Sequence, residues 1–151
     1  MVFILSVIIV ALDQISKYVV IKSLKGFAPH IIIPNFFQLA YVENFGAAFG
    51  ILQNKKVFFI IITLAVIVSI SIFLIKNYYN INIFMRFGLG MFLGGTIGNF
   101  IDRVRFGYVV DFLSFRLFGT YDFPVFNVAD IFIVLGTFII LILILFDRYE
   151  V

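Results

Sequence analysis

Four long apolar runs dominate the chain and alternate with more polar segments. Each run approaches about 20 residues, the length that an α-helix needs to cross the hydrocarbon core of a bilayer. This pattern predicts an all-α membrane protein, a four-transmembrane-helix bundle that forms one integral membrane domain over 1–151. The predicted spans cover residues 2–21, 57–75, 84–103 and 127–146.

The segments between the spans differ in character. Residues 22–56 contain Pro29, Pro34 and several glycines around an alternating run at 36–42, which is typical of a strand between turns. We therefore expect a small β-rich extramembrane segment between the first and second spans. Residues 104–126 form a second segment on the same side of the membrane.

Composition supports a membrane protein. The chain is 64 % hydrophobic and 13 % charged, with a mean hydropathy of +1.19, whereas a soluble domain is about half apolar and about a quarter charged. The basic residues lie scattered at the ends of apolar runs, which argues against a nucleic-acid-binding surface. The chain has no cysteine, so disulfides and thiol chemistry are excluded. We expect neither a metal nor a cofactor.

The start of the chain lacks a basic region and an A-x-A-like cleavage site, so the first run is expected to be an uncleaved span. Asp13 and Lys17 interrupt it four residues apart, on one helix face. This pair either neutralises an inward-facing polar side or supports a site within the bundle, and the two interpretations are compatible.

The stretch 94–130 concentrates polar groups between two apolar runs. It holds four of the eight acidic residues of the chain: Asp102, Asp111, Asp122 and Asp130. Ionisable groups at membrane depth are energetically costly, and they commonly mark functional sites. A functional site is therefore expected here.

Two converging carboxylates that share one proton can act as an aspartyl dyad, in which one activates water and the other polarises a carbonyl. Motifs of other hydrolases, H-E-x-x-H and G-x-S-x-G, are absent from the sequence.

Each acid also has a simpler interpretation. Asp130 can cap a helix that begins at Asn127, Asp102 can pair with Arg103, and Asp122 can be solvated in a turn. Asp111, inside an apolar hexamer, has no partner nearby in sequence.

Five motifs in order resemble those of the lipoprotein signal peptidase (signal peptidase II) family. They are Asp13-Gln14 with Lys17, Asn-Phe-Gly-Ala-Ala-Phe at 44–49, Asn-Phe-Ile-Asp-Arg at 99–103, Tyr-Val-Val-Asp-Phe at 108–112 and Phe-Asn-Val-Ala-Asp at 126–130. The resemblance covers essentially the whole chain.

The resemblance implies an intramembrane aspartyl endopeptidase of the bacterial inner membrane. Such an enzyme removes the signal peptide of a prolipoprotein just before its diacylglyceryl-modified cysteine. Asp111 and Asp130 would be the catalytic dyad. The supporting residues would be Asn99, Asp102, Arg103 and Asn127, with Asn44, Asp13 and Lys17 assisting binding or structure. The expected partners are lipid-modified prolipoproteins and membrane lipids, and a monomer is expected.

The resemblance also implies that both termini are cytoplasmic and that the site faces the outer leaflet. The positive-inside rule favours the opposite orientation. The side that holds the two long segments carries seven basic residues: Lys22, Lys25, Lys55, Lys56, Arg103, Arg105 and Arg116. The other side carries Lys76, Arg86 and Arg148. Basic residues bound within a site would weaken this count.

Two alternatives differ in their chemistry. Another class of intramembrane aspartyl protease requires a Gly-x-Gly-Asp motif, and the nearest match, at 88–91, has methionine in place of the acid. A small channel or assembly subunit could use Asp13, Lys17 and the close-packing series Gly90, Gly94 and Gly98, which leaves Asp111 unexplained.

Within a dyad of Asp111 and Asp130, the helix dipole favours an ionised Asp130 and the apolar neighbours favour a protonated Asp111.

Overall fold

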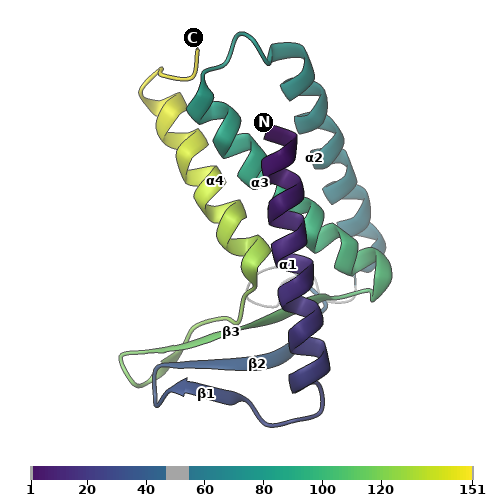
Figure 1. Ribbon diagram of the computed structural model, residues 1–151, viewed down its shortest axis with the longest axis vertical. Helices are drawn as coiled ribbons and strands as arrows, with labels where there is room; N and C mark the ends of the chain where they lie inside the picture. Colours follow the sequence, from purple (N-terminus) through teal and green to yellow (C-terminus); the bar gives the residue numbers. More distant parts are fainter. Residues whose placement is uncertain (1, 47–54, 151) are drawn as a thin grey trace.

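The computed structural model describes residues 2–46 and 55–150 (Figure 1). This part of the chain contains four long helices that overlap the four predicted apolar runs: α1 (Val2–Leu24), α2 (Lys56–Asn77), α3 (Ile83–Arg105) and α4 (Val128–Leu145). Three of the helices described, α1, α2 and α4, are long and apolar enough to cross a membrane. Glycines, amides and charged residues make α3 less apolar, and its role as a fourth span stays a prediction.

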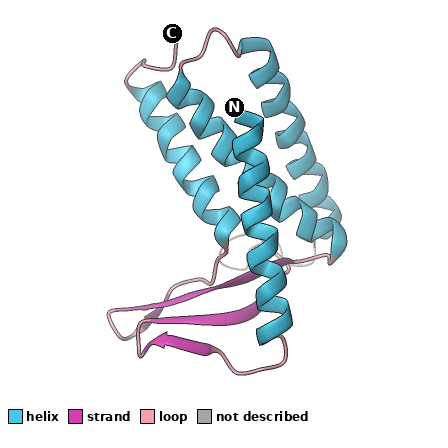
Figure 2. Ribbon diagram, in the orientation of Figure 1, coloured by secondary structure: helices cyan, strands magenta, loops and turns pink. Residues whose placement is uncertain are grey.

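An antiparallel sheet lies at one end of the helices (Figure 2). Its strands, in spatial order, are β1 (His30–Ile33), β2 (Phe37–Asn44), β3 (Val109–Leu117) and β4 (Tyr121–Asp122). The β-rich segment expected between the first two spans supplies only β1 and β2. The sheet also takes β3 and β4 from residues 104–126, because the free edge of β2 needs hydrogen-bond partners that a distant strand provides.

Close packing through glycine places α3 between α1 and α4. A Cβ atom added at Gly94 would lie 2.9 Å from the Ser6 carbonyl oxygen and from Ile9 Cβ on α1, and one added at Gly95 would overlap the Ala129 carbonyl oxygen on α4. The small residues therefore let both neighbouring backbones approach α3. The glycines of α3 were predicted to form a close-packing surface. Helices α1 and α4 of the same chain pack against that surface.

Two separate apolar clusters lie at different levels of the molecule. One, near both termini, contains six buried residues: Val2, Leu74, Ile81, Met85, Leu89 and Leu93. The other joins α1 to β3 and contains Val20, Val110 and Phe112. The termini lie at the end of the helices away from the sheet (Figure 1). Between the two clusters, the helices face one another with polar side chains.

Candidate active site

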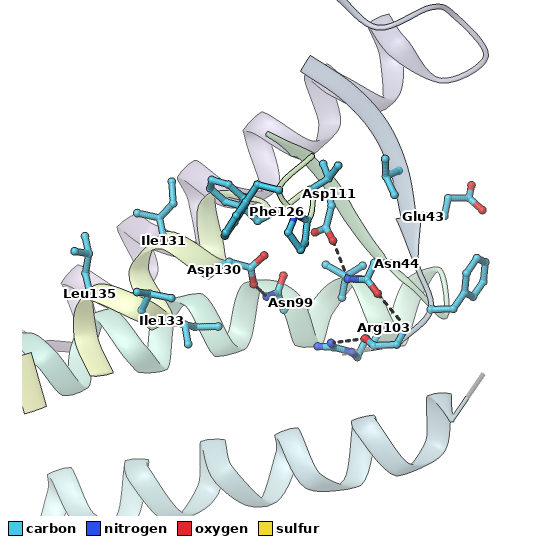
Figure 3. Close-up of a pocket in the computed structure, with 18 residues that line it drawn as sticks. Glu43, Asn44, Asn99, Arg103, Asp111, Phe126, Asp130, Ile131, Ile133 and Leu135 are labelled. Carbon is cyan, nitrogen blue, oxygen red and sulfur yellow. Dashed lines mark hydrogen bonds between the residues drawn. The ribbon is translucent and has the colours of Figure 1, made fainter. Parts of the chain in front are cut away.

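A pocket of about 940 Å³ opens where α3 and α4 meet the sheet (Figure 3). Its polar end is lined by Asn44, Asn99, Arg103, Asp111 and Asp130. Its apolar end is lined by the segment before α4 and by the first turns of α4, including Phe123, Phe126, Ile131, Val134 and Leu135. The pocket thus combines a few convergent polar groups with a large apolar wall, as ligand sites commonly do.

Asp111 and Asp130 reach this pocket from different elements. Asp111 Oδ2 accepts a hydrogen bond from Asn44 Nδ2 at 2.8 Å, and its Oδ1 accepts one from Asn127 Nδ2 at 2.6 Å. Asp130 Oδ1 accepts from Asn99 Nδ2 at 2.7 Å, and its Oδ2 accepts from the Asn127 backbone N–H at 3.1 Å. All four carboxylate oxygens therefore receive an N–H donor, which fixes how both groups are oriented.

Asn127 begins α4 as its N-cap. Its Oδ1 accepts from the Asp130 backbone N–H at 3.0 Å, and with the reciprocal bond from its own N–H this forms a capping box. The capping interpretation of Asp130 is therefore confirmed, and it is compatible with a place in the pocket. Local helix capping is what positions the Asp130 carboxylate.

A buried ion cluster, formed by Asp13, Lys17 and Asp102, lies behind the pocket. Lys17 Nζ is 2.8 Å from Asp13 Oδ2 and 2.8 Å from Asp102 Oδ2, and all three side chains are at most 2 % exposed. The backbone N–H of Ala129 donates to Asp13 at 3.0 Å, and that of Val110 donates to Asp102 at 3.1 Å. The cluster therefore joins α1 to α3, α4 and β3.

The expected pairing of Asp102 with Arg103 is wrong. Consecutive residues of a helix point in different directions, so Asp102 faces Lys17 while Arg103 faces the pocket. The Arg103 guanidinium donates to the Gly46 carbonyl oxygen at 3.5 Å and lies 5.1 Å from the centre of the Phe59 ring.

The ion cluster also orients the amides that hold the two aspartates. Lys17 Nζ donates to Asn99 Oδ1 at 2.9 Å, as does Asn127 Nδ2 at 3.1 Å. With its oxygen facing these two donors, Asn99 must turn its NH2 group toward Asp130. Asp13, Lys17 and Asp102 thus lie outside the pocket and act on it through Asn99.

The surroundings of Asp111 change its tendency to ionise. Burial, and then the negative charge of Asp130, raises the pKa of Asp111 to about 7, against the opposing hydrogen bonds from Asn44 and Asn127. Asp111 therefore tends to hold a proton near neutral pH. This supports the expectation that Asp111 is the protonated member of the pair.

Gln14 belongs to the first motif, but the sequence assigned it no role. Gln14 donates to Asp102 Oδ1 at 2.9 Å and to the Gly98 carbonyl oxygen at 3.2 Å, and both bonds link α1 to α3 beside the ion cluster. Its position beside Asp13, as a polar break in an apolar run, was the available signal. The part of the second motif at 47–49 lies outside the described residues.

The comparisons with known proteins agree on one family. The family model described as signal peptidase (SPase) II matches residues 5–146. The lipoprotein signal peptidase of Caldanaerobacter subterraneus subsp. tengcongensis is 49 % identical over 142 residues, which cover 91 % of each chain. That of Staphylococcus aureus is 40 % identical over 143 residues, which cover 95 % of this chain and 86 % of the relative.

Solved structures agree with the sequence relatives. Two structures described as a bacterial membrane enzyme are each 38 % identical to this chain. One has a TM-score of 0.84 and covers 97 % of this chain and 88 % of its own, and the other has a TM-score of 0.83 with 95 % and 92 % covered. With a family model that spans nearly the whole sequence, this chain belongs to the signal peptidase II family, the lipoprotein signal peptidases.

Proposed function

We propose that this protein is an intramembrane aspartyl endopeptidase that cleaves the signal peptide from diacylglyceryl-modified prolipoproteins, immediately before the lipidated cysteine. Membership of the signal peptidase II family supports prolipoproteins as the substrate class. One observation carries the aspartyl mechanism. Asp111 and Asp130, on separate elements, line one pocket and are each held by two N–H donors.

In the proposed reaction, ionised Asp130 accepts a proton from a water molecule as the water oxygen attacks the scissile carbonyl carbon. Protonated Asp111 donates its proton to the carbonyl oxygen, which gives a tetrahedral diol. The diol collapses by returning a proton to Asp111, while Asp130 protonates the leaving amine and the C–N bond breaks. The products are an acid and an amine, and both aspartates regain their starting states.

The remaining pocket residues suit this substrate. The apolar wall, which includes Phe126, Val134 and Leu135, offers contacts for acyl chains and for apolar signal-peptide residues. The Arg103 guanidinium lies in the polar end of the same pocket and provides a positive charge beside the pair of aspartates. Asn44, Asn99 and Asn127 act as supports that orient Asp111 and Asp130.

We further propose that α3 is the fourth span, that both termini are cytoplasmic and that the pocket faces the outer leaflet of the inner membrane. The opposing charge count is weakened by the contacts of three of the seven basic residues at the sheet end. Lys25 pairs with Glu43, Arg116 pairs with Asp122, and Arg103 lines the pocket. Bases engaged in this way are poor indicators of topology.

The test is cleavage of a diacylglyceryl-modified prolipoprotein by the purified protein in detergent. Asp111→Asn and Asp130→Asn should each lower kcat by at least about a hundredfold, because each removes a proton-transfer group. Both variants should still be extracted as folded protein, and Asp122→Asn, outside the pocket, should cleave as the wild type does. Near-wild-type turnover by Asp111→Asn would show that the dyad assignment is wrong.

A further inference from the structure

Four polar side chains at the edge of the pocket have no part in the proposed reaction. Lys25, Tyr41, Glu43 and Tyr108, which we call the Tyr108 cluster, come from the turn after α1, from β2 and from the residue before β3. Glu43 accepts hydrogen bonds from the Tyr41 hydroxyl at 2.8 Å and from Lys25 Nζ at 3.2 Å. The Tyr108 hydroxyl lies 3.0 Å from that of Tyr41 and 3.5 Å from Lys25 Nζ.

The cluster flanks the part of the sheet that carries Asn44. Glu43 directly precedes Asn44, and Tyr108 directly precedes Val109, the partner of Asn44 in the pairing of β2 with β3. Figure 3 shows Glu43 and Asn44 on opposite sides of β2, as alternating side chains of a strand require. The cluster therefore ties together the two strand ends from which Asn44 reaches Asp111.

Aromatic packing extends the cluster to the pocket wall. The centre of the Tyr108 ring lies 5.2 Å from that of Phe45, which lines the pocket, and 5.7 Å from the stacked ring of Phe106. The backbone N–H of Gly46 donates to Asn44 Oδ1 at 3.0 Å. Because this bond occupies the amide oxygen, it turns the NH2 group of Asn44 toward Asp111.

The cluster keeps its charges in the pH range in which Asp111 titrates. The hydrogen bond from Tyr41 lowers the pKa of Glu43, and the contacts with Tyr41 and Glu43 raise the pKa of Lys25. Burial, and then the hydrogen bond with Tyr108, raises the pKa of Tyr41. Glu43 is thus ionised near pH 7, while Lys25 and Tyr41 are protonated. The Tyr108 cluster can therefore affect Asp111 through the position of its side chains and not by transferring a proton.

We propose that the Tyr108 cluster positions Asn44 for the peptidase reaction, holding its amide where it hydrogen-bonds Asp111. This inference rests on the proposed function, because it gives the cluster a purpose in that reaction. An exposed ion pair alone contributes little to stability. The Tyr108 cluster differs from such a pair, because it joins three segments of the chain and adjoins the strand ends that place Asn44 and Phe45 at the pocket.

Tyr108→Phe tests the inference, because it removes the hydroxyl and keeps the ring packing. The change removes the contacts of the Tyr108 hydroxyl with Tyr41 and Lys25. If these contacts hold Asn44 in place, the Asp111 carboxylate then loses a donor that favours its ionised form. The pKa of Asp111 should rise from about 7 to about 8, and kcat should fall about threefold to tenfold, as expected for one hydrogen bond. Glu43→Gln, which removes the charge that Tyr41 and Lys25 both contact, should act in the same direction.

The titration can be followed by carbon-13 NMR of labelled aspartate carboxyls in detergent, with the Asp111 signal identified by its loss in Asp111→Asn. Asp122→Asn is the matched control, because it breaks the Arg116–Asp122 pair, which lies 2.6 Å apart in the same sheet and away from the pocket. It should change neither the titration nor kcat. In an Asn44→Ala background, Tyr108→Phe should have no further effect.

Two results would overturn the inference. One is a wild-type titration and kcat in both Tyr108→Phe and Glu43→Gln, and the other is a full Tyr108→Phe effect in the Asn44→Ala background. The titration requires no turnover, so this test is separate from that of the proposed function. A wild-type protein that cleaves no prolipoprotein would refute the function, whereas an Asp111 titration that is unshifted in both Tyr108→Phe and Glu43→Gln would refute the role of the cluster.

Discussion

At the scale of the residue, Asn127 has two roles that the geometry of a single amide makes inseparable. Its Oδ1 accepts from the backbone of Asp130 and caps α4, while its Nδ2 donates to Asp111 and to Asn99. Because the oxygen and the nitrogen lie on opposite sides of the amide, capping the helix turns the donor toward Asp111. The residue that begins α4 is therefore also the residue that links the two aspartates.

The raised pKa of Asp111 predicts how cleavage depends on pH. In the proposed reaction, Asp111 must be protonated to donate to the substrate carbonyl. Because this pKa belongs to the protein without substrate, kcat/KM should fall as the pH rises through about 7. Asn44→Ala removes a hydrogen bond that favours the ionised form, so this decline should move to higher pH, while the maximal kcat/KM falls. The measurement is kcat/KM from pH 5 to 9 in detergent. A decline that moves to lower pH in Asn44→Ala would contradict this assignment.

The pKa of Asp111 also affects stability. The pKa lies above its unfolded value, so the native state binds more protons than the unfolded chain between about pH 4 and 7. The contribution of Asp111 to stability is therefore complete at low pH and is lost as the pH rises to about 7. Asp111→Asn should remove this part of the pH dependence, which thermal unfolding at several pH values would reveal.

At the scale of the element, α3 organises the molecule. Glycines on two of its faces let α1 and α4 approach its backbone, and Asp102 near its end completes the buried ion cluster. Lys17 lies between Asp13 and Asp102, with one carboxylate on α1 and the other on α3. Close packing and charge pairing thus act together to set the spacing of the three helices behind the pocket.

The ion cluster should therefore contribute to both stability and activity. Lys17→Met leaves two buried carboxylates without their cation and should destabilise the protein by about 3–5 kcal/mol. Asp102→Asn keeps the Lys17–Asp13 pair but turns an NH2 group toward one of its donors, and about 1–3 kcal/mol is expected. Both changes should also lower kcat, because Asn99 depends on Lys17 for its orientation.

Thermal unfolding in detergent, followed by circular dichroism, measures the stability of both variants. Lys17→Met should be less stable than Asp102→Asn. Lys22→Met, at an exposed position near the end of the same helix, is the control and should unfold as the wild type does. If Lys17→Met proved as stable as Lys22→Met, the ion cluster would not join the helices energetically.

At the scale of the whole molecule, the sheet lies at one end of the helices and both termini lie at the other (Figure 1). The sheet combines strands from both long segments of the chain, so these two segments lie at the same end of the helices. The pocket lies at this junction, where apolar helix surfaces give way to the sheet. This place agrees with the proposed function, in which a substrate held in the membrane by acyl chains presents its peptide to the aspartates.

The proposed topology can be tested with single cysteines, since the natural sequence contains none. His30→Cys in β1 and Thr120→Cys between β3 and β4 should react with a membrane-impermeant maleimide in intact spheroplasts. Tyr79→Cys, between α2 and α3, should react only after permeabilisation. Each variant serves as a control for the others. Reaction of Tyr79→Cys and Thr120→Cys from the same side would refute α3 as a span, and a fully reversed pattern would refute the orientation.

Local features of the sequence were sufficient for the helices and for the cap of α4. Apolar runs of bilayer length predict the helices, because their backbone hydrogen bonds are made within each run. Asn127 followed by Asp130 predicts the cap of α4, because its partners are three residues apart. The motifs that resemble signal peptidase II also placed Asp111 and Asp130 together, and both line one pocket.

Only the tertiary structure decided the partners that lie far apart in the chain. The pairing of β3 with β2, the contact of Asp102 with Lys17 and the cluster around Tyr108 each join segments that no local pattern relates. A strand needs a partner, and a buried charge needs a counter-charge. Those requirements can be read from the sequence, but the residues that meet them depend on how the helices and the sheet pack.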